Sequence, residues 1–253
     1  MSGQATGFLQ MCGPVETAVL AEGLVTGTAE IDLFRFRLRG EVRSAFLLIE
    51  GINQFAVRLG RRVLNAPDDL SHGVLPVSLR SFRQELPIER STLTAVGEAS
   101  VFGASAFVSV SVHAGGPGGA RVAVAQVVVA AAAAPSARAQ PRGETPAGAG
   151  RLNVFSLTDS KPASVAFGVN GGGELMQEHF PGNPIVPASL MLEFVCRAFG
   201  PGPDEMPALR NVRFLKPVVP GGSYRCRIEG DGVESRFIVL DGDHAPVVRG
   251  EII

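Results

Sequence analysis

A histidine and a glutamate near the C-terminal end of the chain have the residue types that proton-transfer chemistry requires. His179 enters the segment 180–184 (FPGNP), in which two prolines and a glycine restrict the backbone. Glu193 lies fourteen residues further on, within an apolar helix that we predict to start directly after Pro187. A base and a carboxylic acid among apolar neighbours can move a proton on a carbon acid. The alternative is a surface histidine in a proline-rich turn and an ordinary helical carboxylate.

The composition is that of a protein with a real core and no strong charge bias. The chain has 253 residues, of which 45% are hydrophobic, with 23 basic and 24 acidic residues. This length permits one large domain or two of about 125 residues. The charge balance argues against a nucleic-acid or anionic-membrane partner.

No segment reads as a targeting signal or a membrane span. The N-terminus lacks the pattern of a signal peptide, and the most apolar stretch, residues 122–134, is too short to cross a bilayer. The three cysteines (Cys12, Cys196 and Cys226) are scattered, which suggests neither a disulfide framework nor a metal site. We expect a soluble, cytoplasmic protein in which Cys196 is a buried thiol.

A change in composition divides the chain into two halves. Residues 131–151 are rich in Ala, Pro and Gly, as linkers are, and separate an N-terminal unit at 1–130 from a C-terminal unit at 152–253. Segments with strand character are 93–101, 107–112 and 122–129 before the linker, and 153–157, 164–169, 212–214, 223–228, 236–240 and 247–252 after it. Each half is predicted to hold one helix among several antiparallel strands.

The two halves also resemble each other. The segment 46–55 (FLLIEGINQF) has the character of 190–195 (LMLEFV), and aligning them places Glu50 opposite Glu193. Further along, residues 82–87 fall opposite 214–220 within about ten residues of the same offset. The sequence therefore predicts a tandem repeat.

The segment that starts at His179 resembles the signature of the β-hydroxyacyl-acyl carrier protein dehydratases of the hotdog superfamily. In that family His-Phe-Pro-Gly-x-Pro-x-x-Pro-Gly precedes a helix with Glu or Asp, and Ala188 is a departure from the final Gly. The block 212–221 (VRFLKPVVPG) is similar to the strand and turn that follow the family's central helix. The resemblance, over roughly residues 175–225, implies an α+β double hotdog. In it, two tandem folds each wrap a curved antiparallel sheet around a helix, and the first half is degenerate.

The resemblance also implies which acid would serve the histidine. Hotdog dehydratases form their site between two protomers, with the histidine from one and the acid from the central helix of the other. In a fused pair the protomers become an intramolecular pseudo-dimer, with further oligomerisation left open, and His179 would meet Glu50. The first half has Phe36 where the second half has His179, so Glu193 would face a vestigial site.

The residues one turn further along each helix favour the same assignment. The family commonly has Gln after its acid, and Glu50 has Gln54 at this position. Glu193 has Arg197 instead, which would pair with it. We expect Glu50 to be the acid, with Glu193 as the alternative.

The implied reaction is loss of water from a 3-hydroxyacyl thioester on an acyl carrier protein, in fatty-acid or polyketide biosynthesis. Neutral His179 would take the C2 proton, and protonated Glu50 would give its proton to the C3 hydroxyl. The backbone N–H of Ala188, at the helix start, would receive the charge on the thioester oxygen. Together with Ala188, the expected substrate-binding residues are Gln54, Phe180 and Gly182. Neither a metal nor a cofactor is needed, because the substrate brings its own phosphopantetheine arm.

Other functions remain open from the sequence. The same acid and base would serve a double-bond isomerase. A hotdog thioesterase is a further alternative, although thioesterases generally lack the His-Phe-Pro-Gly turn, and a non-catalytic partner subunit of a synthase is another. An acidic carrier would suit the basic residues of the first half, which equally well form a solvated face: Arg35, Arg37 and Arg39 on one strand face, with Arg43, Arg58, Arg61 and Arg62.

Overall fold

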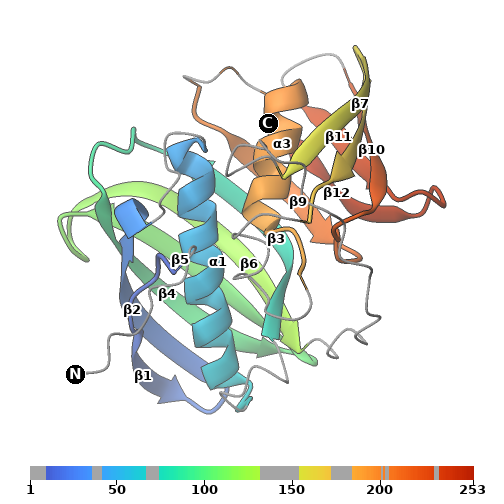
Figure 1. Cartoon of the computed structure of the whole chain (residues 1–253). Helices are drawn as coiled ribbons and strands as arrows, with labels where there is room; N and C mark the ends of the chain where they lie inside the picture. Colours follow the sequence, from blue (N-terminus) through green and yellow to red (C-terminus); the bar gives the residue numbers. More distant parts are fainter. Residues whose placement is uncertain are drawn as a thin grey trace, which may run out of the picture.

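One antiparallel sheet runs through the whole described part of the protein. The computed structural model describes residues 10–35, 42–66, 74–131, 154–171, 184–200, 202, 205–230 and 234–253. Within these residues twelve strands form a single sheet in the order β1-β2-β4-β5-β6-β3-β9-β12-β11-β10-β8-β7. Figure 1 shows α1 lying across one half of this sheet and α3 beside the other half.

The elements fall into two sets of six strands and a helix. The first set is β1 (Glu16–Ala21), β2 (Leu24–Asp32), the short 3-10 helix η1 (Leu33–Arg35), α1 (Ser44–Val63), β3 (Val74–Gln84), β4 (Thr92–Phe102), β5 (Ser105–Ala114) and β6 (Ala120–Ala131). The second set is β7 (Phe155–Lys161), β8 (Ser164–Val169), α3 (Ala188–Phe199), β9 (Ala208–Phe214), β10 (Ser223–Glu229), β11 (Ser235–Leu240) and β12 (Pro246–Ile252).

The two sets have the same topology. Read inward from the free edge, the first set runs β1-β2-β4-β5-β6-β3 and the second runs β7-β8-β10-β11-β12-β9. In both, the helix follows the second strand. The innermost strand of each set, β3 and β9, is the third along the chain. These two strands pair with each other, for example Leu79 with Val212, and so join the two half-sheets. The predicted tandem repeat is confirmed. The predicted linker falls between the sets and, apart from Ala131 in β6, lies outside the described residues.

The strands bury one face against the helices. Along β5, Val108, Val110 and Val112 are buried while the residues between them are half-buried, the alternation of a sheet with one packed face. On α1, Phe46, Phe55 and five other apolar residues (Leu48, Ile49, Ile52, Ala56 and Leu59) are fully buried. The helix packs across β2 to β6 and against α3. The apolar side chains of α1 thus form the core of the first half.

The second half is built around aromatic packing on its shorter helix. The rings of Phe155, Phe167 and Phe194 lie within 4.5–5.6 Å of each other, and Tyr224 stacks on Phe167. Cys196, on the same helix, is buried as predicted, and this burial raises the pKa of its thiol to about 12.

Each of the nine segments predicted as strands on either side of the linker overlaps a strand of the structure, whereas three strands of the first half, β1, β2 and β3, were not predicted. Every residue of β1 is exposed, so its sequence has no alternation of apolar and polar residues. Two register shifts, near Val77 and Arg80, interrupt the pairing of β3 with β6 and with it the period of two. Arg35 was expected on a strand and lies instead in η1.

Close packing of α1 on the sheet yields a test of the core. A Cβ atom on Gly97 of β4 would lie 2.6 Å from the Phe55 ring and 2.8 Å from the backbone oxygen of Ser109. Because Phe55 is fully buried and a backbone oxygen cannot move aside, we expect Gly97→Ala to lower the free energy of unfolding by about 1–3 kcal/mol. Urea unfolding measures this, and Gly118→Ala, in an exposed turn with open space around it, is the control. Equal midpoints for the two variants would contradict the packing.

Candidate active site

The buried polar side chains gather where the two helices meet. Among the described residues five polar or charged side chains are buried, and four of them lie on the helices: Glu50 and Asn53 on α1, and Ser189 and Glu193 on α3. The two helices are in contact. Because burial of polar groups is costly unless they are hydrogen-bonded, this concentration in an otherwise apolar core marks the candidate site.

Glu50 accepts hydrogen bonds on both carboxyl oxygens. Gln54 donates from Nε2 to Glu50 Oε1 at 3.1 Å, and the Ser189 hydroxyl donates to Glu50 Oε2 at 2.6 Å. The amide of Gln54 is itself oriented, since its Oε1 accepts from the backbone N–H groups of Met11 and Cys12, both at 3.0 Å. The side chain of Gln54 therefore turns its N–H donors towards Glu50.

Ser189 brings the second half of the chain to Glu50. It is the second residue of α3, so the first turn of that helix lies against the carboxyl group of α1. Ser189 was not predicted as a site residue, because a serine in the first turn of a helix is common and carries no signal of a distant partner. The resemblance to hotdog dehydratases implied that His179 meets Glu50, and this pairing stays a prediction because His179 lies outside the described residues.

The segment that leads into α3 is held by the block 212–221, which resembles the strand and turn after the family's central helix. The backbone N–H of Val186 donates to the carbonyl of Val218 at 2.8 Å, which joins the segment before the helix to the turn after β9. Ala188 is the first residue of α3, so its N–H is one of the helix's four that have no intrahelical acceptor. His179, Phe180 and Gly182 lie outside the described residues, and their positions relative to Glu50 stay a prediction.

Glu193 lies in a different environment from Glu50. Arg197 Nε donates to Glu193 Oε1 at 2.6 Å, which confirms the predicted pair, and Arg43 Nε donates to Oε2 at 3.2 Å. Arg43 precedes α1 and its guanidinium also lies over the Phe46 ring, 4.9 Å from the centroid. Each carboxylate thus meets the start of the other half's helix, but Glu50 meets a neutral hydroxyl and Glu193 meets a guanidinium.

The pairing of Arg43 corrects part of the expected carrier surface. Only 15% of the Arg43 side chain is exposed, and its guanidinium is committed to Glu193 rather than to a docking partner. Arg35 is not on a strand with Arg37 and Arg39, which lie outside the described residues, as does Phe36. Docking of a carrier at the other arginines remains a prediction.

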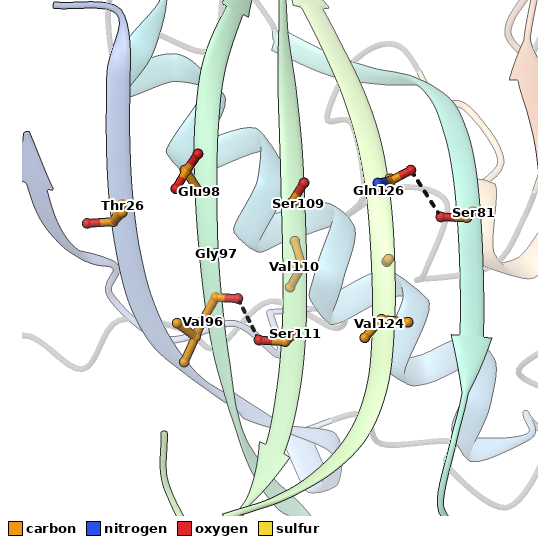
Figure 2. Close-up of a pocket in the computed structure, with 11 residues that line it drawn as sticks. Thr26, Ser81, Val96, Gly97, Glu98, Ser109, Val110, Ser111, Val124 and Gln126 are labelled. Carbon is orange, nitrogen blue, oxygen red and sulfur yellow. Dashed lines mark hydrogen bonds between the residues drawn. The ribbon is translucent and has the colours of Figure 1, made fainter. Parts of the chain in front are cut away.

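A hollow of about 450 Å³ lies on the outer face of the first half. Figure 2 shows it over β2 to β6, with α1 behind the strands, and with polar side chains such as Glu98 and Ser109 lining it. The hydroxyl of Ser81 there donates to Gln126 Oε1 at 3.4 Å. The hollow holds none of the predicted site residues, because the sheet separates it from the helices.

Metal-site clusters and membrane-spanning helices are both absent from the described part of the chain. No group of three or more His, Cys, Asp or Glu side chains there has the arrangement of a metal site. No helix there combines the length and the hydropathy of a membrane span.

The fold, though not the sequence, is shared with known proteins. No protein-family model and no curated protein matches the sequence. The dehydratase domain from the terminal module of the rifamycin polyketide synthase is 12% identical with a TM-score of 0.52, over 96% of this chain and 94% of that one. The dehydratase domain from the CurF module of the curacin polyketide synthase is 8% identical with a TM-score of 0.54, over 96% and 98%.

A third similar structure is an isomerase-inactive variant of the GphF DH1 domain. It is 11% identical with a TM-score of 0.58, over 96% of this chain and 95% of that one. These likenesses show that the chain has an α+β double hotdog fold, as predicted. At such low identities they show the fold alone, so the activity has to be argued from the site.

The contact between Ser189 and Glu50 predicts energetic coupling of the two halves. In a double-mutant cycle of Ser189→Ala and Glu50→Ala, we expect a coupling energy of about 1–3 kcal/mol, because each change removes one partner of the same buried hydrogen bond. Urea unfolding of the four proteins measures it. Ser44→Ala, at the exposed first residue of α1, replaces Ser189→Ala in a control cycle that should be additive. Additivity in both cycles would contradict the contact.

Proposed function

We propose that this protein is a dehydratase that removes water from 3-hydroxyacyl thioesters carried on an acyl carrier protein. One observation carries the proposal: the buried carboxyl group of Glu50 contacts Ser189 in the first turn of α3. That helix follows directly on the His179-Phe-Pro-Gly segment. The fold shared with polyketide synthase dehydratase domains supports the same reaction class.

In the proposed reaction the base and the acid come from different halves. His179 accepts the C2 proton, and the electron pair of the C2–H bond forms the new double bond. Glu50 gives its proton to the C3 hydroxyl, and the C3–O bond breaks as water leaves. A hydroxyl group can both donate and accept, so the contact of 2.6 Å between Ser189 and Glu50 suits the neutral acid and the carboxylate alike.

The start of α3 supports the developing negative charge. As C2 loses its proton, charge accumulates on the thioester oxygen. The backbone N–H of Ala188 has no acceptor within the helix, and the positive end of the α3 dipole lies at the same place. Together they suit the oxyanion in the transition state.

Glu193 has a structural role in this proposal. Both of its oxygens accept hydrogen bonds from guanidinium groups, and one of these groups comes from the other half of the chain. Removing one partner of a buried ion pair leaves the other charge uncompensated. Glu193 is therefore expected to hold the halves together rather than to give up a proton.

The reaction can be tested with short, medium and long 3-hydroxyacyl pantetheine thioesters. We expect the wild-type protein to release the 2-enoyl thioester, seen as loss of water by mass spectrometry. His179→Ala and Glu50→Gln should each lower kcat by about 10²–10⁴-fold, because each removes a proton-transfer group.

Glu193→Gln is the matched control, since it makes the same change at the equivalent place on the other helix. It should lower the midpoint of urea unfolding yet keep kcat within about tenfold of wild type. Loss of activity in Glu193→Gln but not in Glu50→Gln would reverse the assignment of the acid. The isomerase alternative is tested with 2-enoyl pantetheine thioesters: conversion to the 3-enoyl isomer without dehydration of the 3-hydroxyacyl thioesters would indicate an isomerase. No product from either substrate at any chain length would contradict both.

A further inference from the structure

Asn53 carries a buried hydrogen-bond acceptor that no described residue satisfies. Its side chain is 5% exposed, and its Oδ1 has no hydrogen-bond partner within the described part of the chain. Among the described residues, Asn53 Oδ1 is the one buried side-chain acceptor atom without a hydrogen-bond partner. An unpaired buried acceptor lowers stability, so its presence calls for a functional reason.

The position of Asn53 points to the substrate. It follows Glu50 by three residues on α1, so the two side chains project from one face of the helix with Cβ atoms about 5–6 Å apart. The neighbouring polar groups are already engaged, Gln54 with Glu50 and with the backbone of Met11. Asn53 thus offers an open acceptor beside the proposed acid.

The chemistry of the leaving group requires such an acceptor. In the proposed dehydration the C3 oxygen receives a proton from Glu50 on a lone pair, while it still carries its own hydrogen. In a site closed to bulk water that hydrogen needs an acceptor from the protein. Gln54 directs N–H donors towards Glu50, so its amide group does not supply one at this point.

We propose that Asn53 Oδ1 accepts a hydrogen bond from the C3 hydroxyl of the substrate and then from the departing water. This rests on the proposed function and names the part of the substrate that the site recognises. The water leaves with its own hydrogen and the proton from Glu50, the C3–O electron pair goes to oxygen, and His179 keeps the C2 proton. Asn53 gains and loses no proton, so it is a binding residue specific for the hydroxyl group.

The consequence is discrimination between 3-hydroxyacyl and saturated acyl thioesters. A saturated chain in the same place leaves Oδ1 unpaired, whereas the hydroxyl satisfies it. In a His179→Ala background, which prevents turnover, we expect 3-hydroxyacyl pantetheine to bind about tenfold more tightly than the saturated analogue of equal length. Isothermal titration calorimetry measures both affinities.

Asn53→Leu keeps the branched shape of the side chain without its polar atoms. We expect this change to abolish the tenfold preference, while thermal stability stays the same or rises because the unpaired acceptor is gone. Asn53→Ala should likewise abolish the preference for the 3-hydroxyacyl thioester, and it replaces Asn53→Leu in the test if the leucine variant does not fold. Ser78→Ala is the matched control: its buried hydroxyl already donates to Val212 O at 2.7 Å, so the variant should lose stability and keep the preference.

The outcomes separate this inference from the function on which it rests. If wild type forms the enoyl product but the Asn53 variants keep the preference for the hydroxyl, the role of Asn53 is overturned and the dehydratase stands. If no enoyl product forms but the preference depends on Asn53, hydroxyl recognition stands and the dehydratase falls. If neither thioester binds at any chain length, both are overturned.

Discussion

The antiparallel pairing of β3 with β9 is the constraint on which the rest of this structure depends. It joins two half-sheets of identical strand order into one sheet of twelve strands within the described residues. The central helix of each half lies against this sheet, and the pairing of the inner strands brings α1 and α3 into contact (Figure 1). The buried polar groups of both helices can meet only because the pairing of β3 with β9 holds the two halves in one arrangement.

Duplication of the fold creates two equivalent places, and a few residues make them different. At one, a neutral hydroxyl and an amide surround Glu50. At the other, two guanidinium groups enclose Glu193. The second environment is a buried ion pair that links the two halves. In the proposed function, the first of these two places serves the chemistry and the second holds the halves together.

Much of the fold could be predicted, and the failures have physical causes. Strands such as β5 and β10 alternate buried residues with half-buried or exposed ones, and this period of two is visible in the sequence. The edge strand β1 buries none of its residues, and β3 contains bulges, so neither sequence shows a period of two. Ser189 and Asn53 were missed for a related reason: a single polar residue in a helix has no pattern, and its meaning lies in the partner it has or lacks.

The sequence by itself determined where α3 begins, because Pro187 ends an extended segment and the residues after it favour a helix. It also determined the repeat, through the similar apolar segments that carry Glu50 and Glu193. Only the tertiary structure decided which surroundings each carboxylate has. The hydroxyl that contacts Glu50 comes from Ser189, 139 residues away, and two residues so distant become neighbours only when the two half-sheets pair.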